Sequence, residues 1–253
     1  MQSESVESGF LSIFALLTFF IFLITNKYSN KLNNGVLLDK DFLKPQAFHK
    51  EVIARSGGIA SIISLILFIG IHYLIFSKIL YEYIFICTSL FFIGYLDDAK
   101  IKISPSMRLI LMTSFLIVLI SLLPIEIYNI DLIFLNSWLE NNIFSTLFIL
   151  LCFLFIVNGA NLIDGFNGLL AINLIIINSI LLSINMNNNN FEFSVFLISQ
   201  IIILLSFLLF NFPKAKIFFG DSGSYLMGSL VALNTIFTNN LNPNISSFFF
   251  CIL

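Results

Sequence analysis

The amino-acid sequence predicts an all-α polytopic membrane protein, and three observations carry this prediction. The 253 residues are 58% hydrophobic and only 10% charged, and their mean hydropathy is +1.01. A water-soluble domain needs far more charge to cover its surface. The apolar runs are long enough for membrane helices and too long for barrel strands. We therefore expect one integral-membrane domain over residues 1–253, in contact with the lipid bilayer.

Eight apolar runs are long enough to span a bilayer, and a ninth begins near Ile245. The runs lie at 10–25, 57–76, 79–95, 107–123, 143–157, 169–184, 193–210 and 223–238. The few residues after Ile245 cannot cross a hydrocarbon core of about 30 Å at 1.5 Å per residue. We therefore expect about nine transmembrane helices, in a chain that is C-terminally incomplete.

Basic residues predict the orientation of these spans. The first run follows Glu4 and Glu7 rather than a basic leader, which indicates a retained span with its N-terminus outside. In that orientation every one of the 12 lysines and arginines except Lys78 falls in an inner loop. The outer connector 124–142 alternates partly around residues 125–132, which predicts a short strand or hairpin outside the membrane.

Four polar clusters share the predicted cytoplasmic face, and the outer connectors have no comparable density of polar groups. The clusters are 39–58, 97–108, 158–168 and 211–224. A transporter would place such groups and broken helices near the bilayer midplane. Acids at the ends of spans on one face instead favour an enzyme with a single cytoplasmic active site, and a purely structural subunit does not explain the four clusters.

The cluster 211–224 indicates a metal–phosphate site. The turn Gly220-Asp221-Ser222-Gly223 opens an apolar helix and offers one carboxylate together with free backbone N–H groups. The N–H groups suit a phosphate, and the carboxylate tolerates one when a hard cation lies between them. Alternatively, Asp221 is only the N-cap of the eighth span.

The neighbours Asp97 and Asp98 end the third span. Side chains one residue apart on a helix project about 100° apart, so the two carboxylates cannot easily serve the same ligand atom. We expect one to face the metal or substrate and the other to meet a lysine or position the nucleophile. The alternative is a solvated helix end followed by Lys100.

In the cluster 158–168, Asn161, Asp164 and Asn167 are spaced three residues apart and share a face if that segment is helical. The alternative is a polar turn with glycines that pack helices.

The cluster 39–58 contains a basic loop in which His49, Lys50 and Arg55 precede Gly57 and suit a phosphate. Taken alone, His49 is equally well explained as a surface residue.

Together the clusters resemble the polyprenyl-phosphate N-acetylhexosamine-1-phosphate transferases, glycosyltransferase family 4. The matching stretches keep the family's order and spacing and cover most of the chain. They are 45–50 with 55–58, 95–98, 158–169 and 216–224. The loop around His49 lacks the Thr-Pro-Thr-Met-Gly-Gly pattern of the phospho-MurNAc-pentapeptide enzymes. The resemblance is therefore closest to the undecaprenyl-phosphate GlcNAc-1-phosphate transferase branch.

The resemblance implies roles for individual residues. Asp97, Asp98 and Asp164 correspond to catalytic positions, and Asp221 corresponds to the ligand of Mg²⁺, for which Mn²⁺ is a substitute. The implied substrate-binding residues are His49, Lys50, Arg55, Lys100, Arg108, Asn161, Asn167, Asn211 and Phe218. Of these, Asn211 and Phe218 correspond to positions that hold the uridine, and Asn167 stands where the family often has Asp.

The resemblance also implies a reaction. An oxygen of undecaprenyl phosphate attacks a UDP-N-acetylhexosamine, UMP leaves and a lipid-linked sugar diphosphate remains. This would initiate cell-envelope polysaccharide or O-antigen synthesis at the bacterial inner membrane. Alternatives are the phospho-MurNAc-pentapeptide step of peptidoglycan synthesis and a transporter. A phosphate monoester with a second pKa of about 6 is mostly ionised at neutral pH, so positioning should outweigh general base catalysis. Nucleic acid is not an expected partner, and a homodimer is left open.

Overall fold

The computed structural model describes residues 2–29, 31, 36–39, 52–101, 103–130 and 132–245. His49, Lys50 and the part of the predicted ninth span beyond Ile245 lie outside the described residues.

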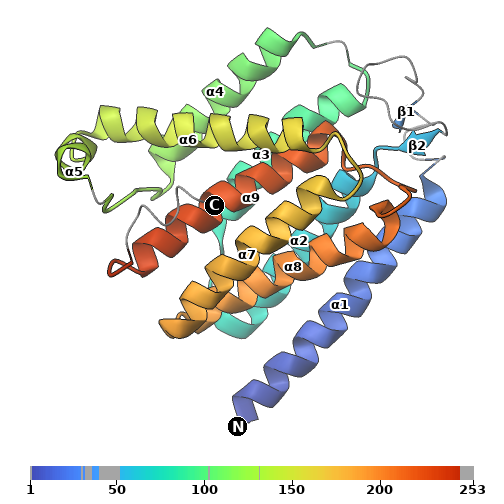
Figure 1. Cartoon of the computed structure of the whole chain (residues 1–253), viewed down its shortest axis with the longest axis horizontal. Helices are drawn as coiled ribbons and strands as arrows, with labels where there is room; N and C mark the ends of the chain where they lie inside the picture. The colour runs from blue at the N-terminus through green and yellow to red at the C-terminus, as the bar shows by residue number, and fades with distance from the viewer. Residues whose placement is uncertain are drawn as a thin grey trace.

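Within these residues the chain forms nine helices and two short strands (Figure 1). The helices are α1 (Gln2–Tyr28), α2 (Gly57–Phe76), α3 (Tyr81–Asp98), α4 (Pro105–Leu122), α5 (Ile133–Leu139), α6 (Asn142–Ile163), α7 (Leu169–Asn187), α8 (Phe191–Asn211) and α9 (Gly220–Leu241). Eight of them coincide with the predicted spans, and the predicted all-α polytopic membrane fold is confirmed. Six are long and apolar enough to cross a membrane, namely α1, α2, α4, α6, α7 and α8.

The helix α9 lies inside the bundle, with α3 and α6 as its main neighbours and α2 and α7 beside them. Every residue from Ser222 to Asn234 is buried. The interior position explains the composition of α9, because polar side chains such as Ser222 and Asn234 bond to neighbouring helices instead of facing lipid. The apolar surface that meets the hydrocarbon is supplied by the surrounding helices.

The outer connector between α4 and α6, in which a strand or hairpin was predicted around residues 125–132, contains instead a short helix, α5, at Ile133–Leu139. In its described residues no strand forms, so that prediction was wrong. Asparagine side chains take the place of a partner strand. Asn136 accepts a hydrogen bond from the Ile130 N–H at 2.7 Å, and Asn240 donates to the Glu126 carbonyl at 2.6 Å. Backbone groups satisfied in this way need no β-ladder.

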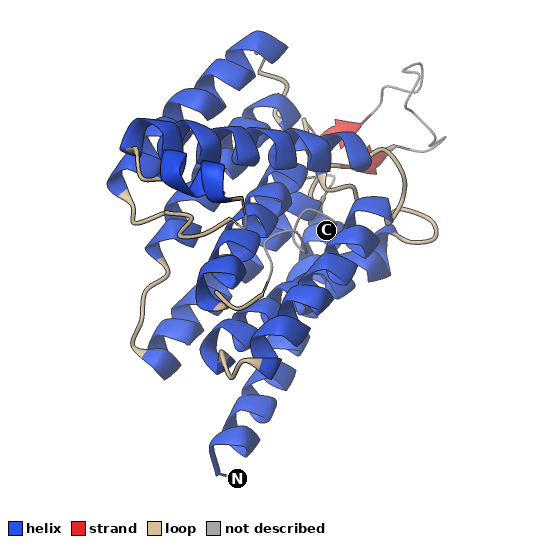
Figure 2. Ribbon diagram, turned by 60° about the vertical axis from the view of Figure 1, so that its left-hand side comes forward, coloured by secondary structure: helices blue, strands red, loops and turns tan. Residues whose placement is uncertain are grey.

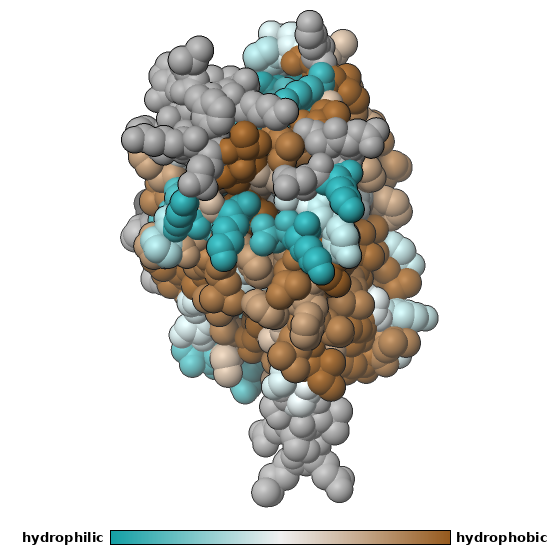
Figure 3. All heavy atoms as spheres, turned by 90° about the vertical axis from the view of Figure 1, so that its right-hand side faces the viewer, coloured by the Kyte–Doolittle hydropathy of each residue, from teal (hydrophilic) through white to brown (hydrophobic). Residues whose placement is uncertain are grey.

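The strands β1 (Leu38–Asp39) and β2 (Ile53–Ala54) pair antiparallel at the end of the bundle where α3, α6 and α8 finish (Figure 1), and Figure 2 shows the pair beside the helices. Ala54 also forms a parallel bridge with Ile217, just before α9. Hydrophilic side chains gather in a band on this end of the molecule, above a mainly hydrophobic surface (Figure 3). The alternating direction of the helices therefore brings the polar segments to one end.

Candidate active site

The chain segment before α9 is held in place by backbone contacts with the start of α2. The N–H groups of Gly57 and Gly58 donate to the carbonyls of Phe218 and Phe219 at 2.8 and 3.0 Å. A Cβ on Gly58 would lie 2.5 Å from the backbone nitrogen of Gly223. Only glycine permits this approach, so the Gly57-Gly58 pair of the basic loop packs α2 against the first turn of α9.

Asn211 lies between two segments of backbone. Its side-chain oxygen accepts a hydrogen bond from the Gly168 N–H at 2.5 Å, and its amide donates to the Ile217 carbonyl at 2.8 Å. The residue is 4% exposed. In this structure Asn211 therefore joins the start of α7 to the segment before α9, whereas the family resemblance implied a uridine contact.

Asp98 is buried against the first turn of α9. Its carboxylate accepts hydrogen bonds from the backbone N–H groups of Asp221 at 3.1 Å and Ser222 at 2.9 Å. The Ser222 hydroxyl adds a third bond at 2.6 Å. The alternative of a solvated helix end is thus wrong for Asp98. The prediction that the N–H groups of this turn bind phosphate is also wrong for these two, because Asp98 already accepts from both.

Asp97 and Asp221 meet at one guanidinium group. Arg108 Nη1 lies 3.2 Å from Asp97 Oδ2 and 2.5 Å from Asp221 Oδ2. All three side chains keep some exposed surface, between 19% and 30%. Asp221 does not cap α9, since the cap position is Phe219 and the Asp221 carboxylate turns to Arg108. These two carboxylates remain accessible to a ligand, unlike that of Asp98.

The residues of the third cluster separate into different positions. Asp164 follows the end of α6, and burial, followed by the charges of Asp221 and Asp98, raises its pKa well above the ordinary value. Asn161 donates to Ser224 Oγ at 2.9 Å and so ties α6 to α9. The exposed Asn167 donates to the Pro213 carbonyl at 3.1 Å. Asp164 is therefore the member of this cluster that shares the electrostatic field of the acids.

Arg55 connects β2 to the acid cluster. It pairs with Asp39 at 2.9 Å and with Asp98 at 3.4 Å. Although burial works to lower the pKa of Arg55, the neighbouring carboxylates of Asp98 and Asp39 raise it above its ordinary value. Lys100 is exposed and donates to the Leu38 carbonyl at 3.2 Å. Sequence reasoning did not identify Asp39 as a partner of Arg55, and its place in the 39–58 cluster was the available signal.

Phe218 is partly buried, and its backbone lies between β2 and α2, where its N–H donates to the Ala54 carbonyl at 2.9 Å. Its neighbour Phe219 is fully buried and stacks on Phe207, with ring centroids 3.5 Å apart. Phe218 is therefore the ring of this pair that keeps some access to solvent. Sequence reasoning also missed Tyr225, which is buried one turn after Asp221 and interacts electrostatically with Arg108.

The implied Mg²⁺ would need oxygen ligands from this cluster of acids. Among the described residues no group of three or more His, Cys, Asp or Glu side chains could hold a metal by itself. Asp97 and Asp221 nevertheless both lie within 3.2 Å of the same atom, Arg108 Nη1. Two carboxylates so close repel unless a cation or proton lies between them, and Arg108 supplies one positive charge. Mg²⁺ commonly uses one or two carboxylates with water and substrate phosphates, so the pair fits this ion.

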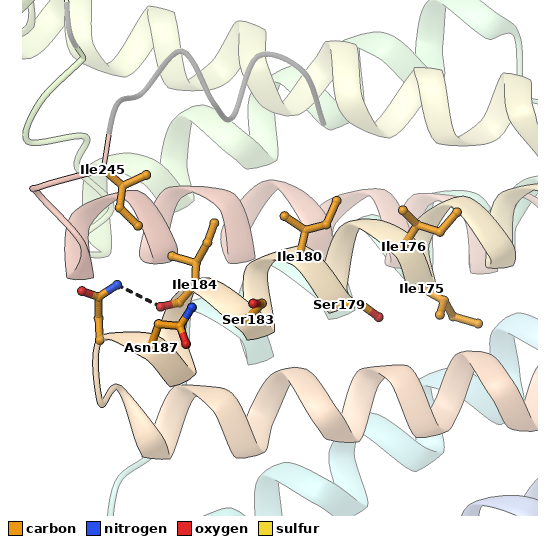
Figure 4. Close-up of a pocket in the computed structure, with 9 residues that line it drawn as sticks. Ile175, Ile176, Ser179, Ile180, Ser183, Ile184, Asn187 and Ile245 are labelled. Carbon is orange, nitrogen blue, oxygen red and sulfur yellow. Dashed lines mark hydrogen bonds between the residues drawn. The ribbon is translucent and has the colours of Figure 1, made fainter.

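A groove of about 530 Å³ runs along α7, away from the carboxylates (Figure 4). Its wall is formed by isoleucines such as Ile176, Ile180 and Ile184 with Ser179 and Ser183 between them. None of the side chains that line it is charged. The groove therefore lacks the groups that a nucleotide or a metal would need.

Comparison with curated proteins finds relatives named phospho-N-acetylmuramoyl-pentapeptide-transferase. The relative from Leuconostoc citreum is 44% identical over 79 residues, which are 31% of this chain and 25% of the relative. The one from Dictyoglomus turgidum is 28% identical over 86% of this chain and 71% of its own length. The one from Prochlorococcus marinus is 32% identical over 77% and 56%. These names favour the pentapeptide alternative over the predicted GlcNAc-1-phosphate branch.

The model of the family described as Glycosyl transferase family 4 matches residues 79–239. The matched range includes Asp97, Asp98, Asp164 and Asp221, which the fold brings to one end of the bundle. Since this match covers more than half of the sequence, the chain belongs to glycosyl transferase family 4.

Proposed function

We propose that this chain transfers a sugar-1-phosphate from a UDP-sugar to a polyprenyl phosphate such as undecaprenyl phosphate and releases UMP. The observation that carries the proposal is the meeting of Asp97 and Asp221 at Arg108. Two accessible carboxylates beside a guanidinium suit a cation and the phosphate groups it neutralises. The named relatives support phospho-N-acetylmuramoyl-pentapeptide as the transferred group. This chain spans 25% of the Leuconostoc citreum relative and 56% of the Prochlorococcus marinus relative, so the proposed activity is that of the whole protein.

Asp221 and Asp97 would hold Mg²⁺, which would neutralise the diphosphate and stabilise the leaving phosphate. Arg108 would bring a further positive charge to the transferred phosphate, because its Nη1 already lies between the two carboxylates. Asp164 lies in the field of Asp221. From its place at the end of α6, Asp164 would orient the water or substrate groups that bind this metal. The lipid phosphate is mostly ionised near neutral pH, so alignment of the reactants contributes more than proton removal.

The experiment that tests the proposal is transfer of radiolabel into lipid. Membranes containing the protein, extended by any residues that follow Leu253 in the natural gene, receive undecaprenyl phosphate, Mg²⁺ and one labelled donor. We expect label from UDP-MurNAc-pentapeptide to enter the lipid fraction with equal release of UMP. Label from UDP-GlcNAc alone would restore the N-acetylglucosamine branch. Passage of label across the membrane without transfer would replace the proposal by a transporter.

We further propose that the acid cluster faces the cytoplasm of a bacterial plasma membrane, where UDP-sugars are found. The distribution of lysines and arginines supports this orientation. Cysteines introduced at the exposed positions Lys214 and Asn188 lie at opposite ends of the helices. We expect an impermeant maleimide to label Asn188→Cys in intact cells, and Lys214→Cys only after lysis. The reverse pattern would invert the topology and separate the site from its donor.

A further inference from the structure

We propose that Asp98 is a positioning residue that fixes the first turn of α9, and with it Asp221, without contacting the substrate. This inference rests on the proposed function, because Asp221 matters there as the metal ligand. The two neighbouring aspartates then have different roles: Asp97 binds the metal, and Asp98 holds the turn that carries Asp221.

The Asp98 carboxylate is buried, and its acceptor sites are already occupied by hydrogen bonds. Its side chain has no exposed surface. Oδ2 accepts from the backbone N–H and the hydroxyl of Ser222, and Oδ1 accepts from the Asp221 N–H and approaches Arg55. A carboxylate with two bonds on each oxygen has used its usual acceptor sites. A phosphate could reach Asp98 only after α9 had moved away.

Beside this carboxylate, the backbones of α3 and α9 are in direct contact. A Cβ on Gly94 would lie 2.4 Å from the Asp221 carbonyl oxygen, and one on Gly220 would lie 2.5 Å from Asp98 Oδ2. Gly220 also has a φ of +72°, which favours glycine. Because both glycines bring backbone and carboxylate into contact, the direction of the Asp221 side chain depends on where Asp98 holds this turn.

Two sources of positive charge stabilise the Asp98 carboxylate, namely the N-terminus of α9 and Arg55. The N-terminus of a helix carries partial positive charge and unpaired N–H groups, and both stabilise a carboxylate placed there. Arg55 supplies a full positive charge to Asp98 and is itself held by Asp39 in β1. The first turn of α9 is thus connected through Asp98 and Arg55 to the strand pair. Displacement of either group would shift Asp221 relative to Arg108.

The test compares three variants of the full chain: Asp98→Asn, Ser222→Ala and Asp97→Asn. Ser222→Ala is a matched probe, because Ser222 is fully buried and cannot touch the substrate. The substitution removes the hydroxyl bond to Asp98 and leaves the backbone N–H bond in place. The measurements are the Mg²⁺ concentration that gives half of the maximal thermal stabilisation, and kcat and KM for transfer.

We expect Asp98→Asn to raise the half-saturating Mg²⁺ concentration about tenfold or more, as loss of a group that orients a metal ligand does. Ser222→Ala should raise it in the same direction by less, and KM for the polyprenyl phosphate should stay unchanged in both. In the double variant Asp98→Asn/Ser222→Ala, the two effects on stability should be non-additive, because both changes alter the bond between these side chains. Asp97→Asn should weaken Mg²⁺ binding while leaving the metal-free unfolding temperature nearly unchanged.

The inference is overturned if Asp98→Asn abolishes turnover with normal Mg²⁺ affinity, or if it raises KM for the lipid phosphate while Ser222→Ala does nothing. A wild-type protein that binds Mg²⁺ without transferring sugar would refute the proposed function and leave the positioning role intact. A wild-type protein whose stability does not respond to Mg²⁺ would refute both.

Discussion

Two polar clusters lie on different stretches of α9 and differ in charge. At its first turn Asp221 meets Asp97 and Arg108 near the end of the bundle. Further along the same helix, Asn234 lies in a buried cluster of neutral side chains. Both clusters connect α9 to α3, so the difference between them lies in their chemistry.

The neutral cluster is complete. Asn234 accepts hydrogen bonds from the Tyr83 hydroxyl at 2.9 Å and the Gln200 amide at 3.1 Å. Its own amide donates to Asn178 at 2.9 Å and Gln200 at 2.7 Å. All four residues are 2% exposed or less. An asparagine with two bonds donated and two accepted has no capacity left for a ligand, so this cluster specifies how α3, α7, α8 and α9 pack.

The charged cluster is incomplete by the same measure. Asp97 and Asp221 share one guanidinium group, and each keeps exposed surface. Like charges held together at the edge of a membrane domain are costly unless they bind something. Burial alone therefore does not distinguish structural polar groups from functional ones. Unbalanced charge combined with solvent access does.

Among the variants that test this difference between the clusters, Asp221→Asn should have the largest effect on turnover. The substitution removes the charge but keeps the backbone N–H that Asp98 accepts. We expect turnover at saturating substrate and fixed Mg²⁺ to fall by about 10²-fold or more, the size seen when one preorganised electrostatic group is lost. Release of UMP measures turnover, and the unfolding temperature in detergent serves as the control for folding. Near-normal turnover would remove Asp221 from the metal site.

Asn234→Leu should lower stability and leave turnover unchanged, the opposite of the effect expected for Asp221→Asn. The change leaves Tyr83, Gln200 and Asn178 without their shared partner. Each stranded buried group costs about 1–3 kcal/mol, so the free energy of unfolding should fall while turnover per folded molecule is retained. Thr235→Val is the matched control, because the Thr235 hydroxyl bonds only within its own helix, to Val231. Loss of turnover without loss of stability would mean that the neutral cluster also serves catalysis.

A smaller effect is expected for Arg108→Gln. Without the guanidinium, Asp97 and Asp221 repel each other in the metal-free protein, and an added divalent cation relieves more strain than it does in the wild type. We expect Mg²⁺ to raise the unfolding temperature about 2–4 °C more than in the wild type, which corresponds to roughly 1 kcal/mol. Arg108→Lys keeps the charge and should respond like the wild type. Equal shifts in all three proteins would show that Arg108 does not balance this pair.

The sequence by itself determined the membrane helices and the end at which the polar segments gather. Apolar runs predicted α2 at the residues where the structure has it, Gly57–Phe76, because burial in lipid requires long uninterrupted hydrophobic segments. Alternation of helix direction then placed residues 97, 164 and 221 at one end without knowledge of any contact. The 100° divergence of Asp97 and Asp98 also predicted that they differ in role, although it did not say how.

Only the tertiary structure decided which aspartate is buried against the first turn of α9. Asp98 turns inward because Gly94 lets α3 touch the backbone of α9, and the N–H groups of that turn then need an acceptor. The same contact buries α9 and completes the cluster around Asn234. Such pairings join residues more than a hundred positions apart, and the periodicity of a single segment carries no information about which other helix it will meet.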